Sequence, residues 1–102
     1  MSTLNIINKS PFEKRSLDQC LARIASDDAV LLIEDAVVVA LAGTSYETDL
    51  KAAAAEKKIY VLTPDLEARG LSDKPVVDGF AEVDYQGFVA LVTEHDRVHS
   101  WL

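Results

Sequence analysis

The sequence predicts an α/β fold: a small three-layer parallel sheet of about four strands with helices on both faces. Residues 29–33 form an apolar run without alternation, which is typical of parallel strands covered on both faces by helices. Along the chain, β-prone segments alternate with segments that have helical spacing or capping residues. A chain of 102 residues has room for one core, so residues 1–102 are expected to form a single domain.

Residues 3–8 are a short β-prone run and are predicted to form the first strand. Two capping boxes compete for the start of the next helix, one beginning at Ser10 and the other at Ser16. The apolar spacing in 17–24 fits a helix from either start. We favour the later start, which would place Cys20 near the helix N-terminus, with the earlier box forming a turn.

Residues 29–33 are the predicted second strand. Residues 36–41 are ambiguous, because their β-branched composition indicates a strand while Asp35 as a cap and the flanking alanines permit a short helix. We interpret them as a helix. A capping box from Thr44 to Glu47 predicts the start of a further helix, which continues through four consecutive alanines.

Residues 59–62 and 80–83 are predicted to form the third and fourth strands. A short helix over 64–70 lies between them and ends at its glycine. Asp84 is expected to cap a final helix that runs towards Trp101. A sheet of about four strands has exposed edges, and open edges invite a partner, so we expect the chain to assemble.

The net charge of −7 argues against direct nucleic-acid binding, because an acidic surface repels phosphate backbones. The longest apolar run, 36–42, is too short to cross a bilayer. Residues 1–5 have neither the basic start nor the long apolar stretch of a secretory signal. We therefore expect a cytoplasmic protein that does not bind membranes.

Cofactor and metal sites have little support in the sequence. No glycine-rich phosphate-binding loop occurs, so no cofactor is expected. His95 and His99 are four residues apart on the predicted last helix, a spacing that can bind a metal. Glu94 and Asp96, the further acids nearby, would point to different helical faces, so no metal site is predicted. The acidic pair 34–35 is explained by a helix cap and a solvated charge.

Cys20 is the only cysteine, so it is either a core thiol or a group that reacts with another molecule. It lies within residues 1–25, which carry four basic and two acidic side chains, whereas the remaining chain is acidic. Arg23 and the helix start would favour its thiolate. Its apolar neighbours Leu17 and Leu21 favour a buried position instead. Both interpretations stay open on the residues alone.

Six stretches, taken in order and spacing, resemble the DsrH/TusB family of sulfur-relay subunits: SPF at 10–12, LLIEDAV at 31–37, YVL at 60–62, DLEARGL at 65–71, VDYQGFV at 83–89 and SW at 100–101. The resemblance covers essentially the whole chain. The 65–71 and 83–89 stretches are its most specific parts. One departure is that Asn5 and Asn8 stand where relatives often carry a histidine before the Ser-Pro step.

The resemblance implies a DsrEFH-like fold and a heterohexamer that holds two copies each of this subunit and two related ones, DsrE/DsrF-like or TusD/TusC-like. It also implies a small cysteine-bearing carrier protein as a partner, with the main sulfur-accepting cysteine of this sulfurtransferase complex on another subunit. In one branch persulfide sulfur passes towards 2-thiouridine in tRNA. In the other branch, dissimilatory sulfur oxidation, it passes to the carrier.

A cysteine in the first helix is similar to the DsrH type, so the resemblance favours the sulfur-oxidation branch. Cys20 would then be a secondary persulfide site or a docking thiol. The alternatives are a TusB-like subunit of the tRNA relay, or a structural subunit without covalent chemistry. Trp101 is the candidate interface residue, because terminal residues fray unless docked and aromatic side chains anchor interfaces.

Overall fold

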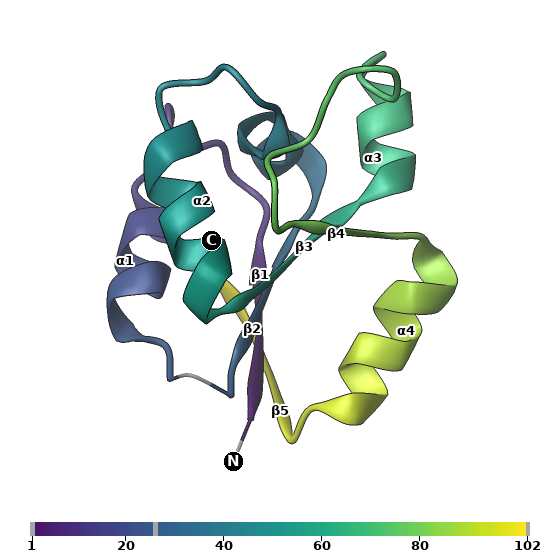
Figure 1. Ribbon diagram of the computed structural model, residues 1–102. Coiled ribbons are helices and arrows are strands. Elements are labelled where there is room, and N and C mark those ends of the chain that lie inside the picture. Colours follow the sequence, from purple (N-terminus) through teal and green to yellow (C-terminus); the bar gives the residue numbers. More distant parts are fainter. Residues whose placement is uncertain (1, 26, 102) are drawn as a thin grey trace.

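The computed structural model describes residues 2–25 and 27–101 as one α/β unit (Figure 1). Its elements are β1 Thr3–Ile7, α1 Ser16–Arg23, β2 Ala29–Leu32, the 3-10 helix η1 Glu34–Ala40, α2 Glu47–Glu56, β3 Lys58–Leu62, α3 Thr63–Ala68, β4 Ala81–Val83, α4 Tyr85–Glu94 and β5 Arg97–Trp101. All strand pairs are parallel, in the order β4-β3-β2-β1-β5. The predicted fold class is confirmed, with five strands in place of about four.

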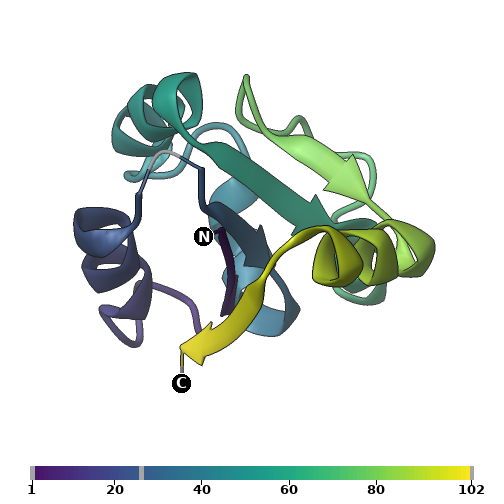
Figure 2. The same cartoon turned by 90° about the horizontal axis from the view of Figure 1, so that it is seen from below.

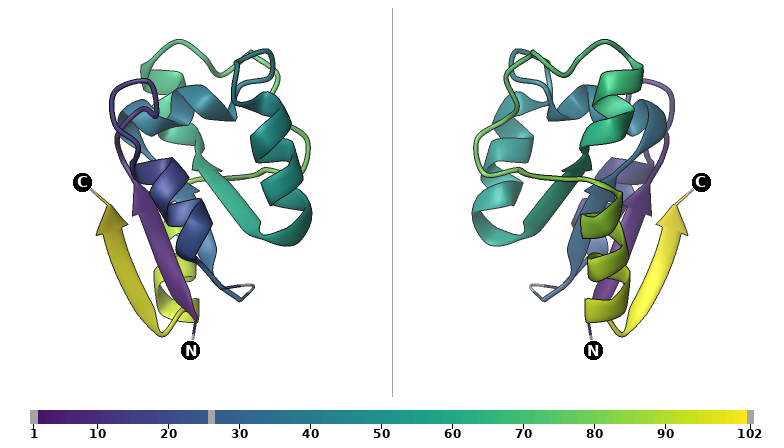
Figure 3. Two further views of the ribbon diagram at one scale, coloured as in Figure 1. Left: turned by 90° about the vertical axis from the view of Figure 1, so that its left-hand side faces the viewer. Right: turned by 90° about the vertical axis from the view of Figure 1, so that its right-hand side faces the viewer.

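The fifth strand corrects the prediction of a helix that runs towards Trp101. The helix ends at Glu94, and His95 already has an extended backbone, with φ −103° and ψ 148°. The next two backbone N–H groups both donate to the carbonyl oxygen of Ser2, and β5 then pairs with β1 along its whole length. Because β1 offers a free edge and 97–101 includes the β-prone Val98 and Trp101, strand pairing replaces the helix. Figure 3 shows β5 as the outermost strand, beside β1.

Helices cover both faces of the sheet, as predicted: α1 and α2 lie on one face and α4 on the other (Figures 1 and 2). The face under α1 and α2 holds the larger core cluster, in which strand residues such as Ile7 and Val30 pack with Leu17 and Leu50. The opposite face is covered by α4 through Leu91 and Phe88. No helix in the described ranges has the length and apolar character needed to span a membrane.

The predicted later start of the first helix is confirmed, because α1 begins at Ser16. The earlier box forms a turn in which the Ser10 carbonyl accepts hydrogen bonds from the N–H groups of Glu13 and Lys14. Residues 34–40 are helical, as we interpreted 36–41, but they form a tighter 3-10 helix whose alanines and valines are mostly buried.

The Thr44–Glu47 box does not cap α2, which begins only at Glu47. Instead, Thr44 Oγ1 accepts from the N–H of Tyr46 at 3.2 Å, and Glu47 Oε1 accepts from the N–H of Gly43 at 2.7 Å. The side chains of Thr44 and Glu47 therefore stabilise the turn that precedes α2 and do not cap the helix. The Asp84 cap is confirmed, since Asp84 Oδ1 accepts from the N–H of Gly87 at 2.8 Å.

Candidate functional site

Cys20 lies in the interior of the protein. It is the fifth residue of α1, and its side chain is 0% exposed. It belongs to the larger core cluster, together with Leu17 of the same helix and Ile7 and Val30 of the sheet. Its thiol therefore has no surface through which a donor persulfide could approach the folded chain.

Burial raises the pKa of the Cys20 thiol to about 12, and the negative charge of Asp28 adds to the increase. The expectation that Arg23 and the helix N-terminus favour the thiolate is therefore wrong. Desolvation is the largest cause of the raised pKa, the charge of Asp28 acts in the same direction, and Cys20 lies beyond the first turn of α1. A neutral thiol is a poor nucleophile, because the thiolate is the species that attacks sulfur.

Trp101 is half-buried at the outer strand of the sheet. Its indole N–H donates to Asn5 Oδ1 at 3.0 Å, and its ring stacks on His99 with centroids 4.7 Å apart. Asn5 is buried, and its amide donates to the carbonyls of Ala29, at 3.2 Å, and Thr3, at 3.4 Å. The candidate interface residue is thus held in place within the chain, which leaves part of its ring at the surface.

A hollow of about 320 Å³ lies beside Trp101, between the end of α1 and the α1-facing side of β1 and β5. Arg23 and His99 line it, and so does Asp28. The carboxylate of Asp28 is occupied, because it accepts hydrogen bonds from the N–H groups of Thr3 and Ala25, both at 2.9 Å. The hollow mixes both signs of charge and does not define one class of ligand.

His95 and His99 do not share a helix, which corrects the predicted spacing. His95 follows α4, and its Nδ1 lies 2.7 Å from the carbonyl oxygen of Leu91. His99 lies within β5 and stacks on Trp101. Within residues 2–25 and 27–101, no three ligating side chains come together as a metal site.

The carboxyl ends of β2 and β3 hold a group of charged residues with structural roles. Asp35 pairs with Arg69 at 3.0 Å. The backbone N–H of Glu34, a residue with φ +50°, donates to Asp65 Oδ2 at 2.6 Å. Sequence reasoning missed that Asp65 supports this turn, although Asp65 and Arg69 belong to the most specific family-like stretch. These contacts tie α3 to the end of β2.

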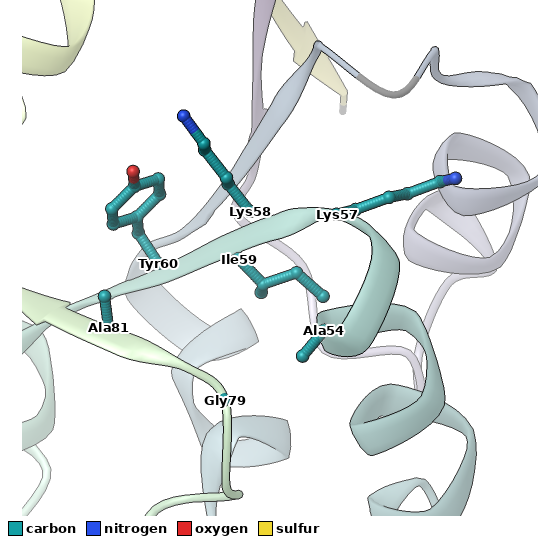
Figure 4. Close-up of a pocket in the computed structure, with 7 residues that line it drawn as sticks. All are labelled: Ala54, Lys57, Lys58, Ile59, Tyr60, Gly79 and Ala81. Atoms are coloured by element: carbon teal, nitrogen blue, oxygen red, sulfur yellow. The ribbon is translucent and has the colours of Figure 1, made fainter.

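A smaller pocket of about 160 Å³ lies between the C-terminal end of α2 and strands β3 and β4 (Figure 4). Figure 4 shows Lys58 and Tyr60 on one side of β3, with Ile59 on the other side towards Ala54. Lys57 points away from Lys58, so the two ammonium groups do not converge on one anion.

Helix α4 exposes apolar side chains, a feature that the sequence analysis did not predict. Tyr85 and Val89 are 60% and 64% exposed, and Val92 is 38% exposed. Val98 of β5, 46% exposed, pairs with Leu4 and so lies on the same face of the sheet as α4. We call these four residues the α4 surface. The sequence feature that could have indicated this exposed apolar surface is the composition of α4, in which Glu94 is the only charged residue.

Comparisons with known proteins agree on the family. The family model described as "DsrH like protein" matches residues 9–98. The protein TusB of Pectobacterium parmentieri is 37% identical over 98 residues, covering 96% of this chain and 99% of that protein. With the same coverage of both chains, TusB of Photorhabdus laumondii is 33% identical over 100 residues and TusB of Shigella flexneri is 31% identical over 98.

Two solved structures share the fold. The crystal structure of the ychN protein from E. coli has a TM-score of 0.79 at 20% identity, covering 98% of this chain and 99% of that one. A protein of unknown function from Methanobacterium thermoautotrophicum has a TM-score of 0.73 at 13% identity, covering 96% and 97%. With a family model and relatives that span nearly its whole length, the chain belongs to the DsrH/TusB family.

Proposed function

We propose that this chain is a TusB-like subunit of a cytoplasmic sulfur-relay complex that passes persulfide sulfur towards 2-thiouridine in tRNA. In this proposal it serves as a structural subunit, and a companion subunit carries the reactive cysteine. The observation that supports this role is the complete burial of Cys20, the only cysteine in the chain. A buried thiol with a raised pKa supports a role without covalent sulfur transfer, because the accessible thiolate is the species that accepts sulfur.

The tRNA branch replaces the sulfur-oxidation branch as our main proposal for two reasons. The relatives with 31–37% identity over nearly the whole chain bear the name TusB. The resemblance to the DsrH type depended on Cys20 in the first helix, and the burial of that thiol weakens this argument for the sulfur-oxidation branch.

The proposed assembly is a heterohexamer with two copies each of this chain, a TusC-like subunit and a TusD-like subunit, which delivers sulfur to a small carrier protein. Trp101 is proposed to lie at a subunit interface, since its indole is anchored by Asn5 and part of its ring stays at the surface. An aromatic ring fixed in this way loses little entropy when a partner covers it.

The test is a deletion of the gene in the organism that encodes it, followed by measurement of tRNA 2-thiouridine and of thiosulfate oxidation. We expect thiouridine to fall, and to be restored equally by the wild-type chain and by Cys20→Ala. Loss of thiosulfate oxidation with unchanged thiouridine would support the sulfur-oxidation branch instead. If Cys20→Ala is stably produced and assembled but restores no thiolation, the structural role is wrong.

A further inference from the structure

The outward side of α4 differs from an ordinary solvent-facing helix surface. Only Leu91 of its ten residues is buried, yet nine of the ten carry no charge. Tyr85, Val89 and Val92 follow the spacing i, i+4 and i+7, so they form one stripe along the helix. A helix that is apolar on both sides is normally covered on both sides. The second side of α4 is open in the isolated chain.

Both ends of this stripe are acidic. Asp84 caps the first turn of α4, while Glu94 ends the helix and Asp96 follows it, and all three are exposed. Arg97 lies on the opposite face of the sheet from Val98, because neighbouring residues of a strand alternate. Among the described strand residues, Lys58 is the one base on the α4 face. The apolar stripe is therefore framed by more negative than positive charge.

The acidic ends argue against a second copy of this chain as the occupant. An antiparallel pair of α4 helices would place Asp84 of one copy near Glu94 and Asp96 of the other. A parallel pair would place identical acids together. Either arrangement brings like charges close at the edge of an apolar contact, which opposes association. The same charges also repel an anionic lipid surface.

We propose that the α4 surface docks a dissimilar protein subunit that presents an apolar strip with basic residues at both ends, about 15 Å apart, the length of a ten-residue helix. This proposal rests on the proposed function, which supplies two dissimilar companion subunits. It adds which surface of this chain meets one of them and what chemistry that companion offers.

The test uses the chain co-expressed with its own TusC-like and TusD-like companions, with assembly followed by native mass spectrometry and by titration of the purified subunits. Val89→Asp places a charge at the centre of the stripe, and its matched control is Ala52→Asp at an exposed mid-helix position of α2. We expect Val89→Asp to weaken assembly by about 100-fold and Ala52→Asp to leave assembly unchanged. Val89→Gln, which adds no charge, should weaken assembly by about 10-fold.

A second pair of variants tests the charges. Glu94→Lys reverses the acid at the end of α4, and Glu56→Lys reverses the matching acid at the end of α2. We expect Glu94→Lys to weaken assembly by about 10-fold and to reduce its salt dependence, while Glu56→Lys does neither.

The outcomes separate this inference from the proposed function. If the wild-type chain joins its companions and folded Val89→Asp joins them equally well, the docking surface is wrong and the function stands. If the wild type binds neither companion, both proposals are rejected. A homodimer of the wild type that Val89→Asp abolishes would show that a second copy occupies the stripe, which also overturns the inference.

Discussion

The indole N–H of Trp101 and the side-chain oxygen of Asn5 lie 3.0 Å apart, and this hydrogen bond joins the outermost strand to its neighbour. Asn5 also donates to the carbonyl oxygen of Ala29, so one buried amide links β5, β1 and β2. The Asn5 side chain thereby pairs with the indole N–H and a strand carbonyl on the face of the sheet that α1 covers. An apolar side chain at this position would leave the indole N–H without its partner.

Asn5→Ala should lower the free energy of unfolding by about 1–3 kcal/mol, because it removes the acceptor of the indole N–H and a buried amide. The variant should also shift the tryptophan emission to the red, because the ring of Trp101 gains solvent contact. Trp101 is the only tryptophan, so the emission reports on this ring alone. Urea unfolding and emission spectra measure both effects. Asn8→Ala is the control, since the buried Asn8 Oδ1 has no hydrogen-bond partner among the described residues. Equal losses in the two variants would contradict the assigned role of Asn5.

Cys20 should make stability depend on pH in the alkaline range. The unfolded thiol titrates near pKa 9.0, whereas burial raises the folded pKa to about 12. Above pH 9.0 the unfolded chain releases a proton that the folded chain keeps, so the stabilisation is complete below pH 9.0 and is lost as the pH rises towards 12. The loss is about 1.4 kcal/mol for each pH unit.

Urea unfolding of the wild type and of Cys20→Ala at about pH 8 and about pH 10.5 measures this effect. The stability advantage of the wild type should shrink between the two pH values, because the alanine variant lacks the titrating thiol. Parallel decreases in both proteins would show that the Cys20 pKa is not raised in the folded state.

Gly87→Ala should destabilise the fold by about 1–3 kcal/mol, although alanine is the better helix former. A Cβ at this position would lie 2.9 Å from Val83 Cβ, so β4 and α4 would have to move apart. Gly70→Ala is a useful comparison, because Gly70 has φ +69° and open space around it. Its cost should be about 1 kcal/mol, from backbone strain alone. Thermal unfolding of both variants decides whether the close approach at Gly87 sets the larger cost.

Asp84→Ala should cost about 1 kcal/mol, because the N–H of Gly87 loses the carboxylate oxygen that caps α4. Asp84→Asn keeps a side-chain oxygen at the same place and should be nearly neutral. Chemical unfolding of the two variants, side by side, checks this. If both variants lost the same stability, charge at the helix start would matter more than the hydrogen bond.

Much of the fold followed from local signals, and the main error, the helix predicted to run towards Trp101, occurred where distant residues decide the outcome. The buried strand predicted at 29–33, observed as Ala29–Leu32, and the Asp84 cap depend on neighbours in sequence, and both predictions are confirmed. The end of the last helix depends on Ser2, whose carbonyl accepts from the N–H groups of Asp96 and Arg97. The sequence of α4 has no glycine or proline at its end to mark this change.

The candidate site was harder to predict than the fold. Helical spacing placed Cys20 on an apolar face, but only the packing shows that its thiol is fully enclosed and that its pKa rises. Helical spacing likewise cannot show which apolar residues of α4 stay exposed, because their exposure depends on how much of the sheet lies beneath the helix. Leu91 is buried there, whereas Val89, two residues away, is exposed.

The register between β1 and β5 has a consequence for biosynthesis. Thr3 pairs with Arg97, so the ribosome must make more than ninety residues after the first strand before that strand meets its outer neighbour. Until then, the nascent chain carries β1 with one side unprotected, and such unpaired strands are prone to aggregation. Slowing translation just upstream of the codons for β5 should therefore reduce the yield of soluble protein, and chaperones that bind emerging chains should restore it.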